Sequence, residues 1–81
     1  MYTVNVMEFE MGNHNRSFSF QGEDQGKVVK AAEHKFTMLV KLACDDVTEE
    51  DLECYLEDGQ YKDDDGVIDV VITHPEIVEV V

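Results

Sequence analysis

The stretch QGKVVKAAEHKFTMLVKLAC, residues 25–44, decides the fold of this 81-residue chain. At 100° per residue, six of its apolar side chains fall within one arc of about 100°, which predicts a long amphipathic helix. Asp24 precedes the helix and is a suitable N-cap, because its carboxylate can accept hydrogen bonds from the free amides of the first turn. This first apolar arc consists of Val29, Ala32, Phe36, Leu39, Val40 and Ala43.

A second apolar arc lies beside the first on the same predicted helix. It consists of Val28, Ala31, Met38 and Leu42. A helix that rests on one sheet needs a single apolar stripe, so this helix has more apolar surface than a sheet alone would cover. We therefore expect a homodimer, or a contact of similar size with a second helix, to cover the second arc.

The residues before the helix predict an antiparallel hairpin. Apolar and polar residues alternate over 2–11 and again over 16–21, and Gly and Asn residues at 12–15 favour a turn between them. The alternation slips by one residue between Val6 and Met7. This slip predicts either a bulge at that point or a strand whose two faces are both partly covered.

The residues after the helix predict a second helix and a second hairpin. Thr48 is a suitable N-cap for a short helix over 49–58, in which Leu52, Tyr55 and Leu56 share one face. A short strand at 60–62, an Asp-Gly turn at 63–66 and a well-buried β-branched strand at 67–73 follow. His74-Pro75 should end that strand, and a final edge strand is expected from Ile77, Val78, Val80 and Val81.

These elements define one small domain over residues 1–81, with the order β-β-α-α-β-β. The predicted class is α+β: a small antiparallel sheet with one long and one short helix packed on one face. The pattern does not predict the order of the strands within the sheet.

The net charge of −13 lies entirely in the second half of the chain. Residues 1–44 contain five acids and five bases, whereas residues 45–81 contain fourteen acids and one base, Lys62. In magnitude, the net charge of −13 exceeds the net charge of about 2–8 that is enough to keep a small domain in solution. A strongly acidic surface attracts basic partners and repels nucleic acid and anionic membranes, so we expect neither direct nucleic-acid binding nor membrane binding.

The acids are densest between residues 45 and 65. The predicted helix over 49–58 carries six of them in ten residues, or about one charge per 2.5 Å, whereas duplex DNA carries about one per 1.7 Å. Acids in the first turn of a helix are favourable, but Glu57 and Asp58 near its end are not. A solvated helix therefore explains only some of the acids, and mimicry of nucleic-acid charge is the main alternative. The residues predicted to bind a partner are Asp45, Asp46, Glu49, Glu50, Asp51, Glu53, Glu57, Asp58, Asp63, Asp64 and Asp65.

A calcium site is a weaker alternative. Asp63, Asp65 and Asp69 partly fit a helix-loop-helix calcium loop, with Gly66 at its sixth position. Positions one and twelve are Tyr61 and Ile72, however, where such a loop has Asp and a bidentate Glu. We therefore expect a hairpin turn and no bound metal.

Other chemistry is not indicated by the sequence. The three histidines are scattered, and no nucleophile motif, phosphate-binding loop or dinucleotide fingerprint is present, so we expect neither an enzyme nor a cofactor. Cys44 and Cys54 form neither a Cys-x-x-Cys motif nor a cysteine framework and are expected to be reduced thiols, with a disulfide joining two helix ends as the weaker alternative. The first five residues show no signal-peptide pattern, and no apolar run approaches about 18 residues, so a cytoplasmic location is expected.

In size, charge and compact α+β layout, the chain resembles the broad class of phage-encoded inhibitors that includes anti-CRISPR proteins and other DNA mimics. This resemblance covers no motif and carries over no functional residue. It implies a small acidic inhibitor, of the anti-CRISPR or anti-restriction kind, that blocks a basic nucleic-acid-binding protein in the host cytoplasm. The alternative is a structural or accessory domain that acts through a hydrophobic homo-oligomer interface.

Overall fold

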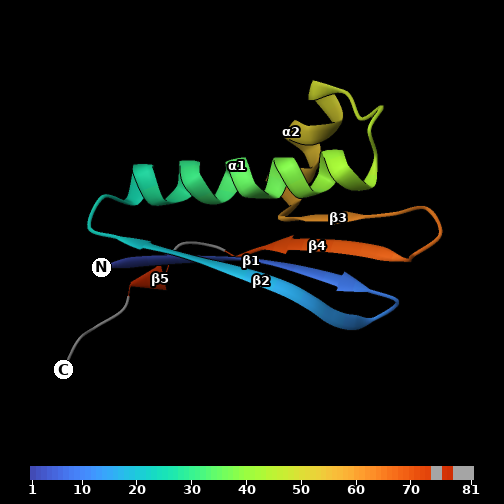
Figure 1. Ribbon diagram of the computed structural model, residues 1–81. Coiled ribbons are helices and arrows are strands. Elements are labelled where there is room, and N and C mark those ends of the chain that lie inside the picture. The colour runs from blue at the N-terminus through green and yellow to red at the C-terminus, as the bar shows by residue number, and fades with distance from the viewer. Residues whose placement is uncertain (74–75, 78–81) are drawn as a thin grey trace.

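The computed structural model describes residues 1–73 and 76–77, and it confirms the predicted α+β class. Four antiparallel strands form one open sheet in the order β2-β1-β4-β3, and β5 pairs with β1. Both helices lie on the same face of this sheet, α1 along its length and α2 over the end that carries β3 (Figure 1). The elements are β1 (Tyr2–Glu10), β2 (Asn13–Gly22), α1 (Gln25–Ala43), α2 (Glu49–Asp58), β3 (Gln60–Lys62), β4 (Ile68–Ile72) and β5 (Glu76–Ile77).

The first hairpin has a tighter turn than the sequence predicts. Strand β1 pairs with β2 from Tyr2↔Gly22 to Glu10↔Asn13, which leaves only Met11 and Gly12 in the loop. Both have positive φ angles, 52° and 80°, as a two-residue type I′ hairpin requires. The predicted turn over 12–15 and the strand start at residue 16 are therefore wrong, because β2 already begins at Asn13.

The bulge lies in β2, at Asn15, and not in β1 as predicted. The register shifts between Glu8 and Phe9, not between Val6 and Met7. Val4, Val6 and Glu8 keep one alternation and are buried, while the side chains on the opposite face are half-buried. The second alternative, a strand with both faces partly covered, therefore describes Met7 and Phe9.

The core lies between α1 and the sheet. Asp24 caps α1 as predicted, since its Oδ1 accepts a hydrogen bond from the amide of Lys27 at 3.2 Å. The 19 residues of α1 span about 28 Å, close to the length of about 30 Å for nine-residue β1. The helix buries Val28, Ala32, Phe36, Leu39 and Val40 against Val4, Val6 and Val70 of the sheet.

Two assignments on α1 need correction. Val28, placed in the second arc by its angle, is buried because it sits over the end of β2. Ala43, placed in the first arc, is exposed because α1 ends at this residue and the chain turns away. The rest of the second arc, Ala31, Met38 and Leu42, is exposed to solvent. Helix α2 therefore does not cover it, and the predicted homodimer stays a prediction.

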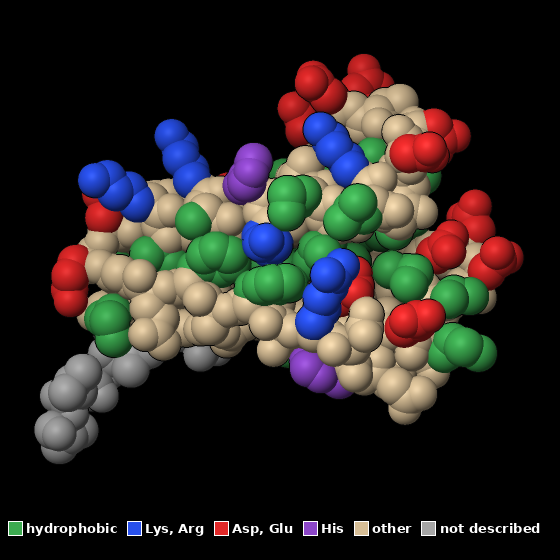
Figure 2. Space-filling view, viewed as in Figure 1, with side chains coloured by type: hydrophobic (Ala, Val, Ile, Leu, Met, Phe, Trp, Pro, Cys, Tyr) green, Lys and Arg blue, Asp and Glu red, His purple; other side chains and the backbone are tan. Residues whose placement is uncertain are grey.

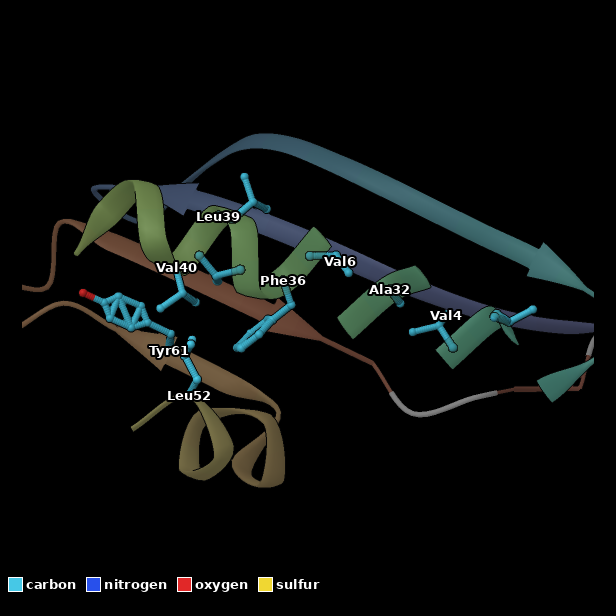
Figure 3. Close-up of a cluster of buried hydrophobic side chains, with 10 residues drawn as sticks. Val4, Val6, Ala32, Phe36, Leu39, Val40, Leu52 and Tyr61 are labelled. Atoms are coloured by element: carbon cyan, nitrogen blue, oxygen red, sulfur yellow. The ribbon is translucent and has the colours of Figure 1, made fainter. Parts of the chain in front are cut away.

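Helix α2 joins the core through one buried residue, Leu52, which lies beside Tyr61 of β3 (Figure 3). Thr48 caps the start of α2 as predicted, since its Oγ1 accepts a hydrogen bond from the amide of Asp51 at 3.1 Å. Gly59 ends the helix in the left-handed conformation, with φ 74°. Because Gly59 reverses the chain, β3 follows at once and runs back under α2.

The second hairpin closes as the Asp-Gly pair predicts. Strands β3 and β4 pair from Gln60↔Val71 to Lys62↔Asp69, and the amide of Gly66 donates to the carbonyl of Asp63 at 2.8 Å. The prediction of a well-buried strand over 67–73 is wrong in extent. Strand β4 is Ile68–Ile72 and only its Val70 is fully buried, because helices cover one face of the sheet alone. His74-Pro75 and residues 78–81 lie outside the described residues, and Ile77 belongs to β5.

Candidate acidic binding surface

The fold brings the predicted partner-binding residues to one end of the molecule. They come from three segments: the loop between α1 and α2, helix α2, and the turn between β3 and β4. Ten of the eleven side chains are exposed and Asp63 is half-buried. Figure 2 shows acidic side chains gathered over α2 and beside this turn, whereas the basic side chains follow α1 and the middle of the sheet. We call the eleven residues the acidic surface.

Helix α2 presents its six acids in two groups. At 100° per residue they cover an arc of about 200°, too wide for one flat face. One group, Asp51 and Asp58, flanks Tyr55 on the side of β3. The other group occupies an arc of about 100° on the adjacent flank, and it consists of Glu49, Glu50, Glu53 and Glu57.

Two stacked tyrosines join α2 to the β3–β4 hairpin. The ring centroids of Tyr55 and Tyr61 lie 5.0 Å apart, with the ring planes inclined at 58°. Tyr61 is 5% exposed and Tyr55 is half-buried. This contact fixes the orientation of α2 relative to the acidic turn.

Carboxylates from both sides converge on this tyrosine pair. Burial raises the pKa of the Tyr55 hydroxyl, and the negative charges of Asp51 in α2 and Asp64 in the turn raise it further. Burial, followed by the charge of Asp63, likewise raises the pKa of Tyr61. Asp51 of α2 and the aspartates of the turn therefore lie close enough to act on one centre.

A shallow cleft of about 460 Å³ opens beside the tyrosine pair. It is lined by Tyr55, Asp58, Gln60 and Lys62. The Asp58 carboxylate and the Tyr55 ring suit the charge and the stem of a partner's arginine or lysine, whereas the positive charge of Lys62 in the same lining opposes it. The sequence analysis placed Tyr55 only on the inward face of the helix. The signal it missed was that Asp51 and Asp58, at i−4 and i+3, share the face of Tyr55.

The stability of α2 does not account for its acids. Glu49, Glu53 and Glu57 follow one another at i,i+4 spacing, where like charges destabilise a helix by about 0.2–0.5 kcal/mol per pair. Its last turn holds Glu57 and Asp58 and contains no basic residue, an arrangement opposed by the helix dipole. Only the three acids of the first turn are favourable for the helix itself.

A second feature that the sequence analysis missed is a buried carboxylate in the sheet. Glu8 is 6% exposed and accepts hydrogen bonds from Arg16 Nε at 3.0 Å, Arg16 Nη2 at 3.4 Å and Asn15 Nδ2 at 2.7 Å. Arg16 stands opposite Glu8 in the β1–β2 register, and Asn15 is the extra residue at the bulge. Since its oxygens are occupied, Glu8 belongs to the structure of the sheet and not to the acidic surface.

Residues 1–73 and 76–77 contain no group of three or more His, Cys, Asp or Glu side chains arranged to hold a metal ion. Of the residues considered for calcium, Asp69 lies in strand β4 and accepts a hydrogen bond from Gln60 Nε2 at 2.9 Å. Both cysteines are free thiols, Cys44 half-buried and Cys54 exposed.

Fold and charge together define a small acidic α+β protein with eleven of its nineteen acids gathered at one end. No helix within the described part of the chain is long and apolar enough to cross a membrane. No protein-family model, curated protein or solved structure matches the chain.

Proposed function

We propose that this protein binds the basic nucleic-acid-binding surface of another protein and blocks it. One observation carries the proposal: eleven carboxylates gather at one end of the fold, and Lys62 is the only base among residues 45–81. The proposed partner is a nucleic-acid-binding protein or complex in the host cytoplasm. The proposed class is a phage-encoded inhibitor of the anti-CRISPR or anti-restriction kind.

The mechanism follows from electrostatics and from the rigidity of the surface. Concentrated negative charge steers a Lys/Arg-lined groove toward the acidic surface and speeds association at low salt. Leu52 and the Tyr55–Tyr61 stack hold α2 against the sheet, so the backbone that carries its carboxylates loses little conformational freedom on binding. The bound protein then excludes nucleic acid both by its charge and by its volume.

The test is a pull-down from a bacterial lysate at low ionic strength, with immobilised protein and elution by duplex DNA. We expect wild type to capture a nucleic-acid-binding protein that added DNA releases. The double variant Glu50→Lys with Glu53→Lys should no longer capture this protein. The matched control is Glu23→Lys with Glu33→Lys, which changes the net charge equally but lies before and within the first half of α1. Capture that is equal for both double variants would contradict the proposal.

The second candidate function is an accessory domain that acts through a homo-oligomer interface. The observation that favours it is the exposure of Met38 and Leu42, at 42% and 71%. Under this alternative, Met38→Glu abolishes function and the reversal of Glu50 and Glu53 leaves it intact.

A further inference from the structure

Strand β2 forms one edge of the sheet and has a long unpaired side. It is ten residues long, and within the described residues it pairs only with β1. Edge strands are usually short, or they carry charges, prolines or bulges that prevent pairing with another chain. β2 has a bulge at Asn15, but the remainder from Ser17 to Gly22 contains no charge and no proline. This segment can accept a further strand.

The exposed part of the second apolar arc lies on the same side of the molecule as this edge. Lys35 lies on α1 one turn after Ala31 and one turn before Met38. Its Nζ is 4.5 Å from the ring centroid of Phe18 in β2. A groove of about 620 Å³ with a mostly apolar lining separates β2 from the first turns of α1, between Phe20 and Ala31. Edge and helix flank therefore form one continuous surface, which we call the β2 edge.

Charge favours a second copy of this chain as the occupant of the β2 edge. Arg16 lies near the start of β2, and Glu8 takes only two of its five N–H donors. Glu23, 89% exposed, follows the end of the strand, and one of its oxygens lies 3.8 Å from the N-terminal amine of Met1, which leaves the other open to a second partner. If two copies of β2 pair antiparallel about a two-fold axis, Arg16 of each copy approaches Glu23 of the other. The acidic surface also lies at the end of the molecule that carries β3, so the charges that repel a second copy are kept away from the contact.

We propose that two copies of this chain associate through the β2 edge. The two sheets then join into one that runs from β3 of one copy to β3 of the other. In this register the axis passes between Ser19 and Phe20, so the Ala31 flanks of the two α1 helices lie on either side of it. Both acidic surfaces stay free at the outer ends of this dimer. The proposal is independent of the proposed function, because it uses no residue of the acidic surface.

Sedimentation velocity over a range of protein concentrations tests the proposal at low and high salt. We expect a dimer that forms more tightly at high salt, since screening weakens the repulsion between two chains of charge −13. Partner binding by the acidic surface should show the opposite dependence on salt. The two-fold axis places each change twice in the interface, so Ala31→Glu, beside Phe20, and Ser19→Lys should each weaken dimerisation on the order of tenfold or more.

Two controls carry the same changes of charge at the far side of the sheet. They are Val67→Glu, in the turn before β4, and Gln60→Lys, on the other edge strand, and both should leave dimerisation unchanged. Circular dichroism of each variant checks that the fold is retained. A chain that remains monomeric at high concentration and at both salt levels would overturn the proposal. So would a dimer that Ala31→Glu and Ser19→Lys weaken no more than the controls do.

Discussion

The ring of Tyr55 in α2 packs against the ring of Tyr61 in β3, with 5.0 Å between their centroids. This contact links the two acidic elements, because α2 lies on one side of the pair and the turn after β3 on the other. The proposed function needs both elements held in one orientation.

Stability should fall in alkaline solution as the two tyrosines ionise. The pKa of each hydroxyl is raised in the fold above its ordinary value of 10.0, first by burial and then by nearby aspartates. For a group with a raised folded pKa, the contribution to stability is complete below the unfolded pKa and disappears as the pH rises through the folded pKa. Urea denaturation from pH 8 to pH 11 should therefore show a decline in stability that begins as Cys44 ionises and steepens above about pH 10 as the tyrosines ionise.

The matched variant for this measurement is Tyr55→Phe, which keeps the ring but removes the hydroxyl. We expect a shallower decline above pH 10 in this variant. An identical pH dependence in wild type and variant would show that Tyr55 ionises as freely in the fold as in the unfolded chain.

Leu52→Ala should detach α2 from the rest of the fold. Leu52 is the one fully buried side chain of α2 within the described structure, and truncation of a buried leucine costs about 2–5 kcal/mol. Hydrogen exchange should show faster exchange of α2 amides than of α1 amides. The control is Leu56→Ala, a half-buried leucine on the same helix, which should cost less. Unchanged exchange in α2 after Leu52→Ala would mean that other contacts hold the helix.

Arg16→Ala should destabilise the sheet. It leaves the buried carboxylate of Glu8 with Asn15 alone as a donor, and a lost hydrogen bond to a charged group costs about 1.5–3 kcal/mol. Because the Arg16 side chain is 48% exposed, water replaces part of this interaction, and the lower end of that range is expected. Arg16→Lys keeps the charge without the guanidinium fork, so its loss should be smaller. Urea midpoints equal to wild type for both variants would show that Glu8 needs no partner.

Local patterns predicted the elements of this fold better than their contacts. The capping residues Asp24 and Thr48 and the Asp-Gly turn act within a few residues of the chain, and the structure confirms all three. The bulge was misplaced because the slip in hydrophobicity at Met7 reflects a half-covered second face, whereas the true shift depends on Glu8 pairing with Arg16. Such a pairing exists only after the hairpin has formed.

For the acidic surface, the composition predicted which residues are exposed but not how they are grouped. The division of the α2 acids into two groups follows from which side of the helix meets β3. The sequence did not predict the strand order, so it gave no means of placing Tyr61 against Tyr55. A half-buried tyrosine with acids at i−4 and i+3 is nevertheless a pattern that could have indicated the centre of this surface.

Cys44 should react slowly with alkylating reagents. Its Sγ donates a hydrogen bond to Asp46 Oδ1 at 3.0 Å, and this bond is the largest cause of its raised pKa, followed by burial and the charge of Asp46. Since the thiolate is the nucleophile, a raised pKa slows the reaction at neutral pH. Site-resolved mass spectrometry with iodoacetamide should show exposed Cys54 modified before Cys44. Asp46→Asn should speed the alkylation of Cys44 and leave the alkylation rate of Cys54 unchanged. An unaltered alkylation rate of Cys44 would show that Asp46 does not raise the pKa of this thiol.

The central claim is that the acidic surface binds a basic protein surface through its charges. Its most direct test is the affinity of the captured partner for wild type and for Glu50→Lys with Glu53→Lys, measured by titration calorimetry across a range of salt. We predict tight binding at low salt that weakens steeply as salt rises, and a loss of about 2–5 kcal/mol in the double variant where those charges are desolvated. An affinity that is insensitive to salt, or unchanged by the double reversal in a folded variant, would contradict the claim.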